Sequence, residues 1–91
     1  MDFEWDSQKA DINAKKHGVS FEDASGVFGD YLSFTYPDLG HSMQEERYII
    51  IGLSSKNRIL VISHTQHGET IRIISARQAT KRERDFYEFR K

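Results

Sequence analysis

The sequence predicts an α+β domain in which a four-stranded, mainly antiparallel sheet and a short N-terminal strand combine with two N-terminal helices and a C-terminal helix. Three observations support this prediction. Helix-capping signals stand before residues 7, 21 and 81, apolar residues alternate along the middle of the chain, and short polar turns separate the alternating segments. The 91 residues, of which 37% are hydrophobic, suffice for one core. We therefore expect residues 1–91 to form a single domain.

The N-terminal third is predicted to hold the short strand and two helices. Residues 3–5 alternate as a strand, and Asp6 is placed to cap a helix over Ser7–His17 that ends at Gly18. Residues 20–23 resemble a capping box, which opens a second helix that runs to residue 28. The two helices are therefore joined by a tight turn.

The remainder of the chain is predicted to form the sheet and the closing helix. The strand-like segments are residues 31–36, 47–53, 58–65 and 70–77. A polar loop at 38–45 follows the first of them, and a turn at His67 and Gly68 joins the last two. Thr80 and Glu83 form a full capping box for a helix that runs to about Arg90.

Turn lengths predict how the last three strands pair. A tight second turn would place Arg58 opposite Arg77, and a symmetric first loop would place Arg47 opposite His64. Like charges directly across a sheet destabilise it, so Arg58 and Arg77 require an anion between them. Either a carboxylate of the final helix (Glu83 or Asp85) or a bound phosphate would supply that anion.

Charge is divided unevenly along the chain. Residues 1–46 hold three lysines against ten acidic residues, a net charge of -7, whereas residues 47–91 hold ten basic residues, seven of them arginine, against four acidic ones, a net charge of +6. Because arginine binds phosphate with two parallel hydrogen bonds, this half predicts contact with a polyanion such as RNA. The alternative is that the two halves neutralise one another inside the fold.

Several function classes are excluded by what the sequence lacks. The absence of cysteine excludes disulfides, thiol nucleophiles and thiolate metal sites, and the six scattered glycines do not form a phosphate-binding loop. The four histidines lack metal-ligand spacing, so we expect neither a metal nor another cofactor. An acidic start and the lack of a long apolar run predict a cytoplasmic protein that does not enter the membrane.

The residue types present are those needed for metal-free RNA cleavage. The RNA 2′-hydroxyl attacks its own phosphate, so an enzyme needs a proton acceptor, cations and a proton donor for the leaving oxygen. Glu46, Arg47 and His64 are candidates for these roles. For His64 the alternative is a buried strand residue bonded to a neighbour, and for His17 it is a favourable position at a helix C-terminus. For His41, in the polar loop, a functional role and a merely structural one are equally supported.

Two long strings resemble one known family. They are Lys-His-Gly-Val-Ser-Phe at residues 16–21 and Arg-Ile-Ile-Ser-Ala-Arg at residues 72–77, and shorter matches extend from Phe3 to Tyr87. In combination they resemble the BrnT family of bacterial type II toxins. The resemblance implies a RelE-like ribonuclease fold and arrest of translation by RNA cleavage. It also implies a partner antitoxin, BrnA, that carries a ribbon-helix-helix DNA-binding region. Operator DNA would be contacted only by that antitoxin.

The resemblance also implies where the site lies. In RelE-like folds the active site is on the concave sheet face, which here implies Arg72 and Arg77 with a contribution from Tyr87, beside the acid–base candidates Glu46, Arg47 and His64. Arg58, Tyr87 and His41 are further candidates for RNA binding. Because Arg72 and Arg77 are five residues apart, a regular strand would point them to opposite faces, and only a bulge or the end of the sheet would bring them together.

A second hypothesis assigns the same residues to binding without catalysis. In this reading the protein is a non-catalytic module that binds RNA or a protein partner through the basic sheet face. Phosphate binding requires only the cations, whereas cleavage also requires a titratable group close to them. The separation between arginines and acid–base groups therefore distinguishes the two readings.

Overall fold

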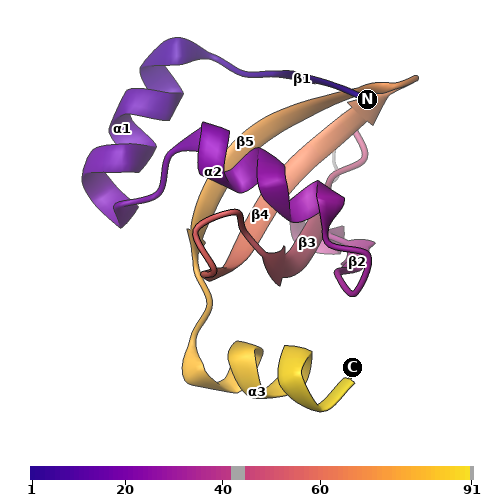
Figure 1. Cartoon of the computed structure of the whole chain (residues 1–91). Coiled ribbons are helices and arrows are strands. Elements are labelled where there is room, and N and C mark those ends of the chain that lie inside the picture. Colours follow the sequence, from indigo (N-terminus) through magenta and orange to yellow (C-terminus); the bar gives the residue numbers. More distant parts are fainter. Residues whose placement is uncertain (42–44, 91) are drawn as a thin grey trace.

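A computed structural model describes residues 1–41 and 45–90 and contains one five-stranded sheet with helices on both faces (Figure 1). The elements in chain order are β1 (Asp2–Glu4), α1 (Ser7–His17), α2 (Phe21–Ser25), the 3-10 helix η1 (Gly26–Gly29), β2 (Phe34–Pro37), the 3-10 helix η2 (Leu39–His41), β3 (Tyr48–Leu53), β4 (Ile59–His67), β5 (Thr70–Gln78) and α3 (Lys81–Arg90). The strand order is β1-β5-β4-β3-β2, and β1 alone pairs in parallel. The predicted α+β class and mainly antiparallel sheet are confirmed. Within the described residues, no helix is long and apolar enough to cross a membrane.

The capping signals act as the sequence predicts. The Asp6 carboxylate accepts hydrogen bonds from the backbone N–H groups of Gln8 and Lys9, at 2.8 and 3.1 Å. In the box that opens α3, Thr80 Oγ1 accepts from Glu83 N–H, and Glu83 Oε1 accepts from Thr80 N–H. Local side-chain chemistry therefore fixes where these helices begin.

Two predicted boundaries were wrong. The predicted helix over 21–28 is α-helical only to Ser25 and continues as the 3-10 turn η1, which contains two glycines of low helix propensity. The predicted strand over 31–36 begins only at Phe34, because Asp30 holds the preceding residues in a turn by accepting hydrogen bonds from Leu32 N–H and Ser33 N–H.

The predicted register of the first hairpin was wrong by one residue. Tyr48, not Arg47, lies opposite His64, and β4 begins at Ile59. The loop between β3 and β4 is one residue longer than predicted, since Leu53 pairs with Ile59 and not with Arg58. Asn57 in this loop takes a left-handed conformation at φ 60°. Arg47 and Arg58 therefore both lie just outside the paired strands.

The predicted register of the second hairpin was wrong by two to three residues. Both strands run on to His67 and Thr70, which pair across a two-residue turn that starts at Gly68, with φ 62°. A β-bulge then shifts the pairing: Ser63 pairs with Ser75 and His64 pairs with Ile73. Ile74 is the additional residue in β5. As a consequence Arg77 lies opposite Val61, and Arg58 does not face it.

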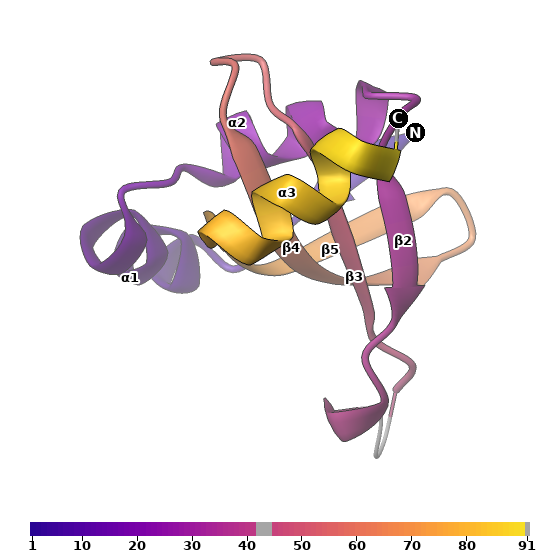
Figure 2. The ribbon, with the colours of Figure 1, turned by 90° about the horizontal axis from the view of Figure 1, so that it is seen from below.

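The sheet separates two clusters of buried residues. We call the side covered by α1, α2 and η1 the α2 face, and its core contains Val19, Phe21, Ala24, Val27, Ile50, Leu60, Ile62, Ile71, Ile73 and Ala76. The opposite side is the α3 face, with a smaller cluster of Ile51, Val61, Ala79 and Tyr87. Figure 2 shows α3 lying across one end of the strands, with α2 behind the sheet. No helix of the described residues covers the other end of the α3 face.

A buried asparagine fastens α1 to the sheet beside the bulge. The side-chain amide of Asn13 donates to the carbonyls of Val19 and Ala76, at 3.0 and 2.8 Å, and its oxygen accepts from Ala76 N–H. The bulge allows Ile73 and Ala76, three residues apart, to face the same core. Packing of the α2 face therefore sets the conformation of β5.

Candidate functional site

The bulge in β5 brings Arg72 and Arg77 to the same face of the sheet. Arg72 pairs with Thr65 and Arg77 pairs with Val61, and these partners are four residues apart on β4. Since alternate residues of a strand share a face, both arginines lie on the α3 face, about 13 Å apart along the strand. A regular strand would have pointed Arg72 and Arg77 to opposite faces. The bulge is one of the two features that were predicted to bring them to the same face.

Arg77 is held by a carboxylate of α3. Its guanidinium donates to Glu83 Oε1 at 2.7 Å and to Glu83 Oε2 at 2.9 Å, the parallel geometry that arginine makes with carboxylates. This pairing lowers the pKa of Glu83 to about 2, and the Glu83 carboxylate in turn raises the pKa of Arg77. Of the two anions proposed from the sequence, the carboxylate is therefore the one found at Arg77.

Arg72 is held less tightly. Its guanidinium lies 3.6 Å from Glu4 on the neighbouring β1, and its side chain is 41% exposed. Two hydroxyl groups lie on this stretch of β4: Thr65 pairs with Arg72 and Ser63 is two positions along, and the oxygen of each is buried and forms no hydrogen bond with any described residue. The partly exposed guanidinium groups are of the type that binds phosphate oxygens.

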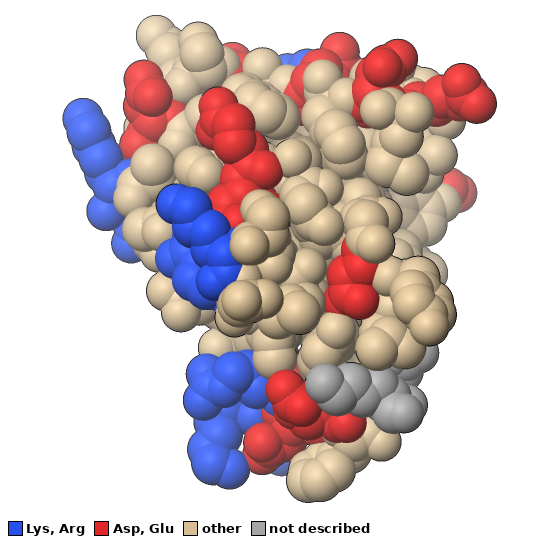
Figure 3. Space-filling model, viewed as in Figure 1, with Lys and Arg blue, Asp and Glu red and all other residues tan. Residues whose placement is uncertain are grey.

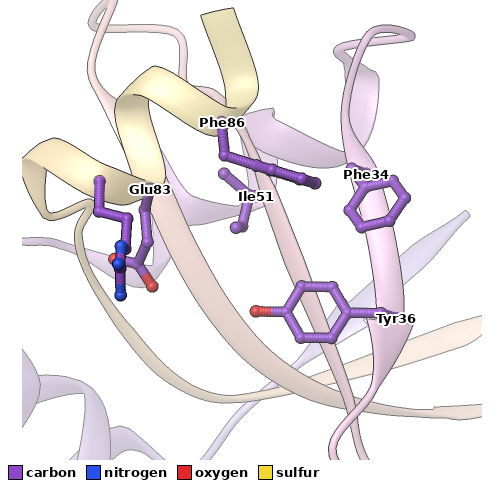
Figure 4. A pocket seen from close by; sticks show the side chains of 6 residues that line it. Phe34, Tyr36, Ile51, Glu83 and Phe86 are labelled. Atoms are coloured by element: carbon purple, nitrogen blue, oxygen red, sulfur yellow. The ribbon is translucent and has the colours of Figure 1, made fainter. Parts of the chain in front are cut away.

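A hollow of about 350 Å³ adjoins Arg77 at the α3 end of this face. It is lined by Phe34, Tyr36, Ile51, Arg82, Glu83 and Phe86 (Figure 4). Burial and the nearby negative charge of Glu83 raise the pKa of Tyr36, so its hydroxyl stays protonated near neutral pH. Tyr36 is a candidate that the sequence reasoning missed, because only the fold brings β2 beside α3.

His64 lies on the opposite side of the sheet from these arginines. It is 3% exposed, its ring contacts Phe28 edge-on at 4.8 Å, and its Nδ1 is 3.5 Å from the carbonyl of Ile62. Burial lowers the pKa of His64, which makes the neutral imidazole the dominant form at neutral pH. This environment agrees with the alternative of a buried strand residue.

Glu46 accompanies His64 rather than the arginines. The Tyr48 hydroxyl donates to Glu46 Oε2 at 2.6 Å, and all three residues line a second, polar hollow of about 380 Å³ with Gln66 and others. This contact raises the pKa of Tyr48. Arg47 lines a neighbouring hollow with Tyr48 at the β2 edge. Of the five predicted catalytic residues, Arg72 and Arg77 thus lie on the α3 face, His64 lines the polar hollow, Arg47 lines the neighbouring hollow, and Glu46 lines both hollows.

Arg58 is bound inside the fold. It donates to Asp23 Oδ2 at 2.9 Å and to the Gly18 carbonyl at 3.1 Å, which ties the start of β4 to α2 and the end of α1. These bonds, with those from Ser55 and Lys56, lower the pKa of Asp23 against the opposing effect of its burial. The position of Arg58 does not support the predicted role in RNA binding.

Tyr87 is also a structural residue. It is 3% exposed, and its hydroxyl donates to Asp30 Oδ2 at 2.5 Å, so α3 is anchored to the turn before β2. Burial and this carboxylate raise the pKa of Tyr87 to about 12. Its neighbour Phe86 presents the exposed ring instead. The side chain of His41 lies outside the described part of the structure.

Charged side chains of both signs lie close together on the surface. Figure 3 shows acidic side chains over the upper part of the molecule, and basic and acidic side chains side by side at α3. One pair on α3 joins Lys81 to Asp85 at 3.0 Å. The alternative of internal neutralisation is therefore seen in the pairs of Arg58, Arg77 and Lys81, while the side chains of Arg72 and Arg77 stay partly exposed and contact with a polyanion stays a prediction.

Comparison with known proteins agrees with this fold. A family model described as the ribonuclease toxin BrnT of a type II toxin–antitoxin system matches residues 5–83. The crystal structure of the Brucella abortus ribonuclease toxin BrnT is similar with a TM-score of 0.68 and 25% sequence identity, covering 89% of this chain and 99% of that chain. No curated protein matches the chain.

Proposed function

Because this chain belongs to the BrnT family of ribonuclease toxins of type II toxin–antitoxin systems, we propose that it cleaves RNA on the α3 face of its sheet. The observation that carries the proposal is the β-bulge at Ile74, which aligns Arg72 and Arg77 on one face. Two partly exposed guanidinium groups on a rigid sheet form a surface for consecutive phosphates of a single strand.

In the proposed reaction these arginines supply most of the catalysis. The RNA 2′-hydroxyl gives its proton to solvent water as its oxygen bonds to phosphorus, and the bond from phosphorus to the 5′-oxygen breaks, so negative charge builds up on the phosphoryl oxygens. Arg72 and Arg77 stabilise that charge, and Glu83 acts as a positioning residue because it fixes the guanidinium of Arg77. The protonated Tyr36 hydroxyl donates to the leaving oxygen.

Glu46 and His64 are not part of the phosphate-binding surface formed by Arg72 and Arg77. They lie around the polar hollow on the other side of the sheet, so they do not contact phosphates bound by Arg72 and Arg77 on the α3 face. Their acid–base role is a second prediction: His64→Gln and Glu46→Gln lower the cleavage rate only if RNA also reaches that hollow. The same assay measures both predictions.

The test compares purified variants on a single-stranded RNA. Arg72→Ala is expected to lower the cleavage rate by about 10² to 10³ while leaving the thermal unfolding midpoint unchanged. Arg72→Lys keeps the charge and loses the forked geometry, so it should recover only part of the rate. Unchanged cleavage by Arg72→Ala would contradict the proposal.

The alternative of a binding module without chemistry predicts a different result from the same samples. Wild-type protein would then bind the RNA in a manner sensitive to Arg72→Ala, and no product would form. Cleavage by RNA 2′-attack leaves a 2′,3′-cyclic phosphate or its hydrolysis product, which identifies the reaction directly.

A type II toxin also has an antitoxin partner, and we propose that a BrnA-like ribbon-helix-helix protein covers the α3 face. Exposed arginines favour acidic side chains on the partner, and opposite charges accelerate association at low salt. Only the antitoxin would contact operator DNA. An association rate independent of ionic strength would contradict this arrangement.

A further inference from the structure

The hollow between β2, β3 and α3 has two aromatic walls. Phe34 contacts Phe86 of α3 at 5.4 Å between ring centroids and Tyr36 of its own strand at 5.7 Å. Figure 4 shows Phe86 and Tyr36 on opposite sides of the hollow, with Ile51 behind them. The free space between these rings is about 350 Å³, at the small end of ligand pockets.

The walls are held in place from outside the hollow. Tyr87 anchors α3 through Asp30, and Glu83 anchors it through Arg77. Phe86, next to Tyr87 on the same helix, is therefore fixed over the hollow although it is 46% exposed. A rigid, partly exposed aromatic ring loses little conformational entropy when a ligand stacks on it.

The rim of the hollow is polar and borders the arginine face. Figure 4 shows the Tyr36 hydroxyl and the Glu83 carboxylate turned toward each other across the opening. Arg82 contributes a cation to the same rim, and Glu83 connects it to Arg77. A ligand of matching chemistry has a flat apolar ring, polar groups on its edge and a negatively charged attachment.

We infer that this hollow binds one unstacked nucleobase of the RNA, next to the phosphate held by Arg77. The base stacks against Phe86 and Tyr36, its edge meets the polar rim, and its phosphate lies toward the guanidinium groups. The small volume and the polar rim fit one planar base better than the apolar side of a helix. The inference rests on the proposed function, because it assigns a base site to the same RNA.

The experiment measures binding separately from cleavage. Short single-stranded RNAs with 2′-O-methyl groups cannot undergo 2′-attack, so their affinity is measured by fluorescence anisotropy on intact protein. Phe86→Ala is expected to weaken binding about tenfold. Phe89→Ala is the matched control, because Phe89 is on the same helix, is 88% exposed and does not line the hollow; its affinity should equal that of the wild type.

A second series of RNAs tests whether the lost contact is to a base. One base at a time is removed to leave an abasic site, and each RNA is measured with wild-type protein and with Phe86→Ala. At one position base removal should weaken wild-type binding about tenfold and leave the variant unaffected, because the stacking partners have been removed in turn. That non-additivity is the signature of a base seated against Phe86.

The remaining outcomes overturn the inference. It is wrong if Phe86→Ala binds every RNA as the wild type does, if no abasic position is coupled to Phe86, or if the variant loses affinity only for the antitoxin. In the first of these cases, loss of cleavage by Arg72→Ala would leave the proposed function standing. Conversely, suppose that unmodified RNA stays uncleaved while one abasic position is still non-additive with Phe86→Ala. That result would contradict the proposed cleavage and support the base site.

Discussion

Two arginine–carboxylate pairs lie on opposite sides of this sheet and differ in what surrounds them. On the α2 side, the Asp23 side chain is 1% exposed and receives bonds from Arg58 and the neighbouring loop. On the α3 side, the Glu83 side chain is 22% exposed, and its partner Arg77 is 42% exposed. The same chemistry is enclosed in one place and accessible to ligand in the other. Exposure, not residue type, therefore separates a structural arginine from a candidate phosphate ligand.

The largest expected effect is on the enclosed pair. Asp23→Ala leaves the charge of Arg58 without its buried partner, so we expect a loss of about 3 to 5 kcal/mol in the free energy of unfolding, measured by urea denaturation. Glu83→Ala is the matched substitution on the other face. Because solvent and salt screen that pair, its loss should be smaller, about 1 kcal/mol or less. Equal losses would show that exposure does not distinguish the pairs.

Acid should weaken the exposed pair in a defined pH range. The pKa of Glu83 is about 2 in the folded protein against 4.5 for the ordinary group, because Arg77 stabilises the carboxylate. Stability contributed by Glu83 is present above pH 4.5 and is lost as the pH falls toward 2. Urea denaturation of the wild type and Glu83→Gln across this range should give curves that converge as the pH decreases. Parallel curves would contradict the pairing.

On the α2 face, His64 should make the free energy of unfolding depend on pH in a higher range than Glu83 does. Burial lowers the pKa of His64 below its ordinary 6.5, so the unfolded chain binds the proton more readily. Stability therefore falls as the pH decreases below about 6.5, by up to about 1.4 kcal/mol per pH unit. His64→Gln should remove this slope. His67→Gln is the control, because His67 is exposed on the same strand and pairs with Glu45 at the surface.

The smallest expected effect is that of chelation. Among residues 1–41 and 45–90, no three histidine, aspartate or glutamate side chains gather as a metal site. If Arg72 and Arg77 stabilise the phosphate charge, EDTA should leave the cleavage rate unchanged, as followed by product formation on a gel. Activity that disappears with EDTA and returns with magnesium or manganese would replace the arginine mechanism by a metal-dependent one.

Local chemistry determined the elements of this protein. The capping groups at Asp6, Ser20 and Thr80 mark the helix starts, and strand alternation marks the sheet, because each depends on residues a few positions apart. The strings at 16–21 and 72–77 resemble the BrnT family, and the family model over residues 5–83 confirms that resemblance. A carboxylate of the final helix was one of the two anions predicted near Arg77, and Glu83 is the carboxylate found there, although the predicted pairing of Arg77 with Arg58 was wrong.

The tertiary structure decided how these elements combine into a site. The left-handed Asn57 and the bulge at Ile74 set the registers that moved Arg47 and Arg58 out of the predicted pairs and placed Arg72 and Arg77 on the same face. The bulge lies where Asn13 of α1 binds the backbone of Ala76, a contact between residues 63 positions apart that no local pattern reports. The same packing buried Tyr87 and His64 and exposed Phe86. Which side of a strand or helix faces the core is a long-range property, and it decides which of the predicted site residues are exposed at the surface.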